Sequence, residues 1–172
     1  GIVIACNTVS AIAGKTLRAE FSIPVYDMIA PAAKLASQKT RNGKIGVIAT
    51  RATVASHAYQ QHLARFKVFE QACPLFVPFV EEGELSGEIV ERLARRYLSF
   101  VVKEQCDTLI LGCTHFPLLA PIIQDIVGAS VTLIHCGEAV VRDMHISSSL
   151  HTDQFFVTDI TPRYQEVAEM IL

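Results

Sequence analysis

The sequence has 172 residues, of which 51% are hydrophobic and 19% are charged, so the chain can bury a core as one large domain or two small ones. The formal net charge is -2 at pH 7 and Lys and Arg are scattered, which excludes the basic stripe that nucleic acid or an anionic membrane requires. No apolar run approaches the ~18 residues of a membrane span, and the first residues lack the basic leader of a signal peptide. We therefore expect a cytoplasmic globular protein that binds small polar or anionic molecules, not nucleic acid or membrane.

Short β-branched runs alternate with helix-length segments along the chain. The runs expected as buried strands are residues 2–5, 45–49, 108–112, 131–135 and 155–158. Strands separated by helix-length segments predict mainly parallel sheets flanked by helices on both faces. The expected fold class is therefore α/β.

The clearest helix is predicted between residues 84 and 105. Apolar residues recur there at every fourth position, and a run of charged residues lies between them. The apolar residues are Leu85, Ile89, Leu93, Tyr97 and Val101. We expect this row to face the core and the charges to form a solvated face.

Two boundaries divide the chain into a pair of pseudo-symmetric lobes. A polar patch over residues 37–44 is the best linker candidate, and a second boundary is expected near Gly137. Residues 1–40 and 137–172 would form the first lobe, and residues 42–136 the second.

The sheet of the first lobe has few expected strands. Its opening strand is apolar throughout, and a central strand of this kind needs neighbours on both sides. We infer that sequence preceding Gly1 belongs to the native protein and supplies the N-terminal strands of this lobe.

Five cysteines, at positions 6, 73, 106, 113 and 136, form an odd count without a close pair. This pattern argues against a disulfide framework and against a structural zinc site, so the thiols are expected to be free. Cys73, Cys106 and Cys136 are expected to be structural. A metal site built from Cys113, His115 and Cys136 fits no common zinc spacing, and no metal is expected.

The other two cysteines occur in matching contexts. Residues 2–8 and 109–115 share one order: an apolar strand, a small residue, a cysteine, polar residues and then a helix. Each lobe holds one copy, and the carboxyl ends of parallel strands are where ligands bind. At a helix N-terminus, Cys6 and Cys113 would be stabilised as thiolates, with pKa values lowered toward neutrality. The same backbone groups, with Asn7, Thr8 and Thr114, would bind a substrate carboxylate.

Two thiols on opposite sides of one carbon suit the inversion of an amino acid at Cα. One base removes the proton from one face while a conjugate acid delivers a proton to the other face. A pyridoxal phosphate mechanism would call for a lysine near a strand end, whereas the six lysines lie in helix-like or linker contexts. We therefore expect no cofactor.

Two segments resemble the signature motifs of the glutamate racemase family, within the aspartate/glutamate racemase superfamily: Ala-Cys-Asn-Thr-Val-Ser at 5–10 and Gly-Cys-Thr-His-Phe-Pro at 112–117. Residues 72–83 are similar to the same family, and residues 49–53 resemble its substrate-contacting threonine loop. The resemblance implies a two-lobed enzyme with its active site between the lobes, which interconverts L- and D-glutamate and supplies D-glutamate for peptidoglycan, cell wall biogenesis and cell shape. It is compatible with a homodimer.

The resemblance also implies roles for individual residues. Cys6 and Cys113 would be the two proton donors and acceptors, with His115 acting beside Cys113. The residues implied as substrate contacts are Asn7, Thr8, Thr53, Thr114 and His115. Glu81 is a candidate auxiliary carboxylate, which would interact with the substrate amine or tune a base.

The family's N-terminal Asp-Ser-Gly segment and its Tyr-Gly contact have no counterpart in this sequence and would precede Gly1. We therefore expect the stretch from Gly1 onward to racemise glutamate poorly by itself. Three alternatives stay open: a superfamily relative acting on aspartate, a hydantoin or maleate; an inactive, truncated binding module; and an enzyme with a cysteine nucleophile in acyl or phosphoryl transfer.

Overall fold

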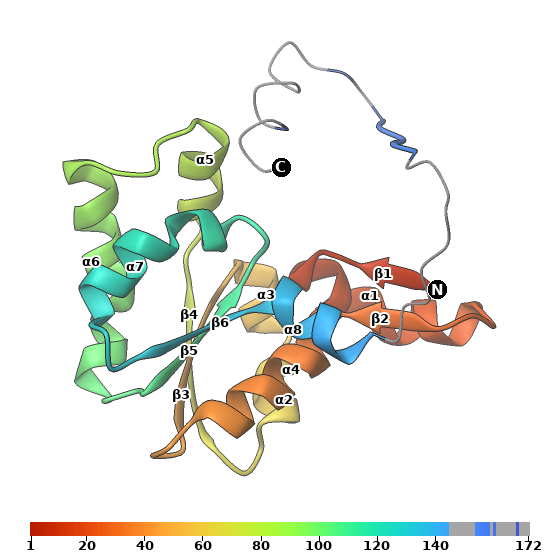
Figure 1. The fold of residues 1–172 in the computed structure, drawn as a ribbon, viewed down its shortest axis with the longest axis horizontal. Helices are drawn as coiled ribbons and strands as arrows, with labels where there is room; N and C mark the ends of the chain where they lie inside the picture. Colours follow the sequence, from red (N-terminus) through yellow and green to blue (C-terminus); the bar gives the residue numbers. More distant parts are fainter. Residues whose placement is uncertain (145–153, 159, 161–167, 169–172) are drawn as a thin grey trace.

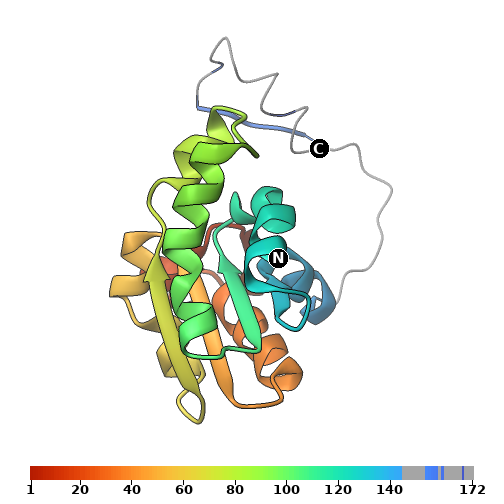
Figure 2. The same cartoon turned by 90° about the vertical axis from the view of Figure 1, so that its left-hand side faces the viewer.

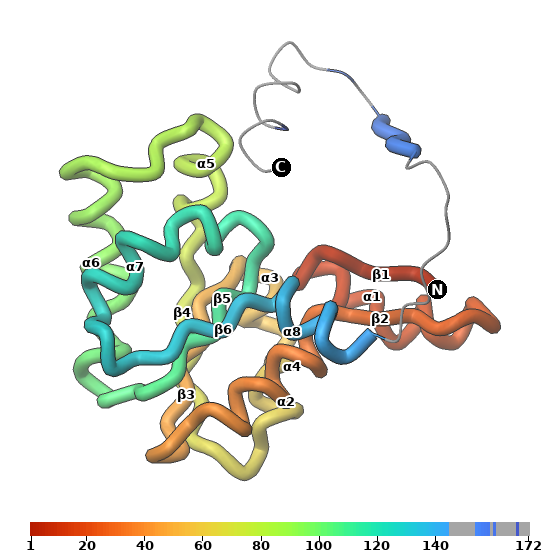
Figure 3. The backbone as a smooth tube through the Cα atoms, viewed as in Figure 1, coloured from red at the N-terminus to blue at the C-terminus, as the bar shows by residue number. Residues whose placement is uncertain are grey.

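Two parallel sheets and the helices around them make up the described part of the chain. The computed structural model describes residues 1–144, 154–158, 160 and 168. Figure 1 shows a larger sheet with helices on both faces and a two-stranded sheet beside it, and Figure 3 follows the same path as a tube. The expected α/β class with parallel sheets flanked by helices is confirmed.

All strand pairs in both sheets are parallel. The strands of the large sheet are β3 (Lys44–Ala49), β4 (Lys67–Ala72), β5 (Thr108–Gly112) and β6 (Thr132–His135), and those of the small sheet are β1 (Ile2–Ile4) and β2 (Val25–Asp27). The order of the large sheet is β4-β3-β5-β6. Every residue of β5 is buried, as expected for a central strand between two layers of helices.

Helices cover both faces of the large sheet. One face carries α5 (Phe76–Glu81), α6 (Glu88–Lys103), the 3-10 helix η1 (Phe116–Leu119) and α7 (Ala120–Val127). The other carries α2 (Ile29–Lys39), α4 (Ala58–His62) and α8 (Cys136–Asp143). The remaining helices are α1 (Asn7–Glu20), beside the small sheet, and α3 (Arg51–Ala55), directly after β3. Figure 2 shows α6 in front of the strands. None of the helices in these ranges is long and apolar enough to span a membrane.

The strand order creates a switch point between β3 and β5. The chain moves from β3 to β4 in one direction, and then to β5 and β6 in the other direction. Right-handed crossovers put the helices of the two directions on opposite faces, as seen for α4 on one side and α6 and α7 on the other. The connections that follow β3 and β5 therefore diverge, and this is where open α/β sheets bind ligands.

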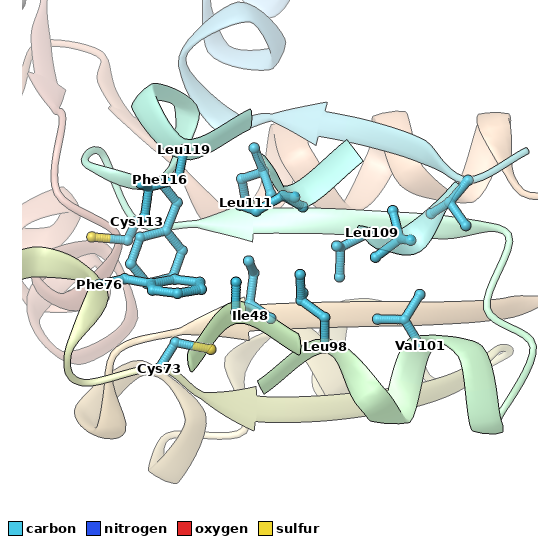
Figure 4. Packing of buried hydrophobic residues seen from close by; sticks show 14 of the residues in the cluster. Ile48, Cys73, Phe76, Leu98, Val101, Leu109, Leu111, Cys113, Phe116 and Leu119 are labelled. Atoms are coloured by element: carbon cyan, nitrogen blue, oxygen red, sulfur yellow. The ribbon is translucent and has the colours of Figure 1, made fainter. Parts of the chain in front are cut away.

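An aromatic cluster fixes the two short helices that flank this switch point. Phe76 of α5 packs edge-to-face against Tyr97 of α6 and against Phe116 of η1, with ring centroids 5.2 and 5.3 Å apart. Phe76 and Phe116 are fully buried, and Figure 4 shows them beside Ile48 and Leu98. The cluster holds α5 and η1 in a fixed relation to the end of β5.

The predicted helix at residues 84–105 exists, but its limits and its buried face differ from the prediction. It begins at Glu88, because Gly87 before it has a φ of 102°, which is incompatible with helical backbone. Its buried residues are Val90, Ala94, Leu98 and Val101. Ile89 is 74% exposed, which contradicts its predicted place in the core. A row at every fourth position rotates by about 40° per step and so winds off the buried stripe.

Four of the five predicted strands are present, and the prediction of a strand at residues 155–158 is wrong. Residues 155–158 have no strand structure, and Phe155 and Phe156 are 77% and 89% exposed. An apolar run becomes a strand only when a neighbouring edge accepts its hydrogen bonds, and no strand among the described residues pairs with this one. The prediction also lacked β2, which is only three residues long, and β4, an edge strand that carries polar residues.

Helices near both predicted lobe boundaries pack on the large sheet. The interior of α2, with Ala32 and Ala36 fully buried, contacts Ile45 and Ile110, and α8 packs against α2. Residues 37–39 of the predicted linker end α2, so only the turn after Lys39 connects it to β3. The division into 1–40 with 137–172 and 42–136 stays a prediction, and much of 137–172 lies outside the described residues.

Candidate active site

Cys6 and Cys113 line the same cavity. Cys6 follows β1 as the N-cap of α1, and Cys113 follows β5 just before η1, so the two residues come from different sheets. The cavity has a volume of about 170 Å³, and its lining residues are Cys6, Asn7, Thr8, Thr50, Val77, Gly112, Cys113, Thr114 and His115. The structure thus brings together both cysteines and most of the polar residues that the sequence singled out.

Burial, not a helix terminus, dominates the chemistry of Cys113. The residue is 8% exposed, and this burial raises the pKa of the Cys113 thiol. The backbone N–H groups of His115 and Phe116 and the Thr114 hydroxyl oppose the rise, while the charge of Cys6 adds to it. The expected shift of the Cys113 pKa toward neutrality is therefore wrong in this structure. Figure 4 shows the Cys113 sulfur pointing away from the packed side chains.

His115 connects Cys113 to Glu81. The Cys113 Sγ atom lies 3.7 Å from His115 Nδ1, and His115 Nε2 lies 3.4 Å from a carboxylate oxygen of Glu81. Thr114 Oγ1 is also within 3.4 Å of His115 Nδ1. The Glu81 carboxylate orients the imidazole, because its contact with Nε2 leaves Nδ1 facing the thiol and the Thr114 hydroxyl. Among the roles considered for Glu81, this geometry favours the tuning of a base.

Three threonine hydroxyls form a closed hydrogen-bonded group at the wall of the cavity. Thr8 Oγ1 lies 2.8 Å from Thr50 Oγ1 and 3.2 Å from Thr53 Oγ1, and the last two atoms are 3.0 Å apart. Thr50 also caps α3 by accepting a hydrogen bond from the Thr53 backbone N–H. Thr53 is fully buried and does not line the cavity, so it lies behind Thr8 and Thr50. Its predicted substrate contact stays a prediction.

Asn7 is almost completely buried, with 2% of its surface exposed, although it lines the cavity. Its Oδ1 atom accepts a 2.6 Å hydrogen bond from the Tyr59 hydroxyl. Its Nδ2 atom is buried without a hydrogen-bond partner. A buried donor without a partner is rare in proteins, and a ligand in the adjacent cavity is one way to satisfy it.

The other three cysteines do not line the cavity. Cys73 is fully buried, and burial raises its pKa. Burial also raises the pKa values of Cys106 and Cys136 to about 11. Cys136 contacts the Tyr59 hydroxyl and the Leu111 carbonyl. No group of three or more His, Cys, Asp or Glu side chains suited to a metal ion occurs in the described ranges.

A family model for Asp/Glu/hydantoin racemases matches residues 1–144. This chain belongs to that racemase family. Relatives in the family include the glutamate racemase of Aquifex pyrophilus, which is 46% identical over 179 residues, and that of Streptococcus agalactiae serotype III, which is 40% identical over 186 residues. Both alignments cover 99% of this chain, and they cover 68% and 70% of the two relatives.

Solved structures of the racemase family share the fold. The glutamate racemase of Francisella tularensis in complex with D-glutamate superposes with a TM-score of 0.88 at 34% identity, covering 99% of this chain and 68% of that one. The isoform RacE1 of Bacillus anthracis gives a TM-score of 0.79 at 39% identity, covering 82% of this chain and 55% of that one. This chain therefore spans between about half and about two thirds of the length of these racemases.

The sequence did not single out every residue of this racemase-family site. Thr50 and Val77 line the cavity, and Tyr59 contacts Asn7 from behind it. Thr50 follows β3 as Cys113 follows β5, so its position after a central strand was a usable signal. Val77 belongs to the segment 72–83 that resembles the family, although it was not named as a site residue. Tyr59 had no such signal, and only the tertiary structure brings it behind the site.

Proposed function

We propose that this protein interconverts L- and D-glutamate by proton transfer at Cα. The observation that carries the proposal is that Cys6 and Cys113, supplied by two different sheets, line one cavity. The glutamate racemases among its relatives, which reach 46% identity, support glutamate as the substrate. A two-thiol mechanism of this kind needs no cofactor.

In the proposed reaction, the thiolate of one cysteine removes the proton from Cα and becomes a thiol. The thiol of the other cysteine gives its proton to the opposite face of the same carbon and becomes a thiolate. The two residues exchange roles for the reverse direction. Burial raises the Cys113 pKa, so this residue favours its thiol form in the empty site, which is the form that delivers a proton.

His115 and Glu81 support the Cys113 side of the reaction. The imidazole is 3.7 Å from the sulfur, which lets it take the proton from the Cys113 thiol when a thiolate is needed. Glu81, at 3.4 Å from the other ring nitrogen, stabilises the imidazolium that results. The pair thus offsets the effect of burial on Cys113.

Hydrogen-bond donors around the cavity bind the carboxylates of the substrate. The amide Nδ2 of Asn7 has no hydrogen-bond partner, and the hydroxyls of Thr8 and Thr114 lie at the cavity wall. The backbone N–H groups that start α1 add to this set, because the first N–H groups of a helix lack helical partners. Thr53 acts through Thr8 and Thr50, to which its hydroxyl is bonded.

The test is a pair of cysteine substitutions in the protein as the cell makes it. Cys6→Ser and Cys113→Ser are each expected to abolish racemisation of glutamate, measured by circular dichroism polarimetry. In D₂O, each variant is expected to exchange the α-proton of only one enantiomer, because one base is still present. Cys106→Ser, which changes a buried thiol away from the cavity, serves as the matched control and is expected to keep activity.

Normal turnover by either catalytic variant would overturn the proposal. A panel of aspartate, a hydantoin and maleate distinguishes glutamate from the substrates of other superfamily members. Complete absence of turnover and of exchange with the unsubstituted protein would instead favour a binding module. A covalent adduct on Cys6 or Cys113, detected by mass spectrometry, would favour a nucleophilic mechanism.

The proposal places the protein in the cytoplasm, where it supplies D-glutamate for peptidoglycan and so for cell wall and cell shape. Depletion in a bacterial host is expected to be rescued by D-glutamate in the medium. The predicted homodimer is checked by light scattering during size-exclusion chromatography.

A further inference from the structure

A buried polar network lies directly behind Asn7. The Tyr59 hydroxyl is 2.6 Å from Asn7 Oδ1 and 3.3 Å from Cys136 Sγ, and Cys136 Sγ is 3.2 Å from the Leu111 carbonyl oxygen. Tyr59 is fully buried, and Cys136 is 4% exposed. The network joins α4, α1, α8 and β5, so it ties the small sheet's helix to the large sheet.

The distances in this network favour one arrangement of its hydrogens, because the 2.6 Å between Tyr59 and Asn7 is typical of O–H···O and short for N–H···O. The Leu111 carbonyl only accepts, so the Cys136 thiol donates to it. The single hydrogen of the Tyr59 hydroxyl then goes to Asn7 Oδ1, the closer of its two neighbours. Burial raises the pKa of Tyr59 well above its usual value, so the hydroxyl keeps that hydrogen.

This arrangement determines which way the Asn7 amide points. An amide can flip and exchange its oxygen and nitrogen, and hydrogen-bond partners decide between the two states. Because a hydroxyl that donates requires an oxygen opposite it, Asn7 Oδ1 lies toward Tyr59 and Nδ2 is the unpartnered end. Without the hydroxyl, Oδ1 would lose its partner and both amide orientations would become accessible.

We infer that Tyr59 is a positioning residue for substrate binding, whose hydroxyl holds the Asn7 amide with its donor end free for a substrate oxygen. The inference rests on the proposed racemase function for its kinetic readout. It gives Tyr59, which lines no part of the catalytic cavity, a role through Asn7. It also gives a reason for a buried polar network among the apolar residues of α2, α4 and α8.

The test is a double-mutant cycle on the full chain. Tyr59→Phe removes one oxygen atom and is expected to lower kcat/KM for glutamate about tenfold, mostly through a higher KM, as the loss of one oriented hydrogen bond predicts. In an Asn7→Ala background, the same substitution is expected to change kcat/KM less than about twofold, because Tyr59 acts only through Asn7. Tyr97→Phe removes a phenol hydroxyl outside the network and is the matched control.

Equal effects of Tyr59→Phe in both backgrounds would overturn the inference and indicate general damage to the core. A second measurement is independent of turnover. In protein labelled with ¹⁵N-asparagine, the Asn7 side-chain amide is expected to give two sharp proton signals, and in Tyr59→Phe both signals are expected to shift and broaden as two amide orientations exchange. Unchanged signals would also overturn the inference, whereas lack of turnover by the unsubstituted protein would count against the proposed function alone.

Discussion

Alkylation of the five cysteines provides a direct test of the site, because the structure assigns the thiols different environments. Cys6 is exposed at the cavity, Cys113 is 8% exposed, and the other three are buried away from the cavity. A short pulse of iodoacetamide at pH 8, followed by peptide mass spectrometry, measures each rate. We expect Cys6 to react first, Cys113 next, and the other three last.

The pKa values of Cys106 and Cys136 set how much more slowly these two thiols react than a thiol of ordinary pKa. At pH 8 a thiol of pKa about 11, as in Cys106 and Cys136, is ionised to about 0.1%, whereas a thiol with the reference pKa of about 8.5 is ionised to about 24%. The thiolate fraction of Cys106 and Cys136 is thus about 240-fold lower than that of the reference thiol. Each of their thiolates reacts roughly tenfold faster, because thiolates of higher pKa are stronger nucleophiles. The raised pKa values by themselves therefore make alkylation of Cys106 and Cys136 about 20-fold slower than that of the reference thiol. Burial slows these two thiols further, since the reagent must wait for local opening.

Three outcomes would refute this reasoning. Cys106 or Cys136 reacting as fast as Cys6 in the folded protein would contradict their burial. A rate at Cys106 that does not rise about tenfold between pH 8 and pH 9 would contradict its raised pKa. Glutamate that protects neither Cys6 nor Cys113 would contradict their shared cavity as a substrate site. In guanidinium chloride all five rates should become similar, which controls for local sequence.

Two further predictions concern the wall of the cavity. Glu81→Gln is expected to lower kcat/KM about tenfold for both L- and D-glutamate, because His115 loses the carboxylate that orients it. The free energy of unfolding in urea is expected to change by less than ~1 kcal/mol, since the pair is partly exposed. The exposed Glu84→Gln is the control, and unchanged kinetics in the Glu81 variant would contradict a role for the pair. Gly112→Ala is expected to destabilise the protein by about 1–3 kcal/mol in urea, because the new Cβ would lie 2.9 Å from the Ile48 carbonyl oxygen. A loss below about 0.5 kcal/mol would show that the backbone yields at this point.

Local pattern accounts for most of the secondary structure. Four expected strands were found because each is a run rich in apolar and β-branched residues. Two of them, β3 and β5, lie inside the large sheet, where burial on both faces selects such residues. The two strands that were not expected lack such a run: β4 carries Lys67, Glu70 and Gln71, and β2 has three residues, one of which is Asp27. The run at 155–158 failed for the opposite reason, because apolar character without a pairing edge does not make a strand.

The sequence by itself determined which two cysteines belong to the site. In each case a strand, a cysteine and a helix follow in that order, which puts the thiol at a strand's carboxyl end. Only the tertiary structure decided which groups act on them. Glu81 reaches His115 across 34 positions, and Thr8 reaches Thr50 across 42, because helix and strand packing joins segments that no local pattern relates. The pKa of Cys113 shows the same limit. A helix terminus is visible in sequence and lowers a thiol pKa, but the burial that outweighs it is a property of the packed fold.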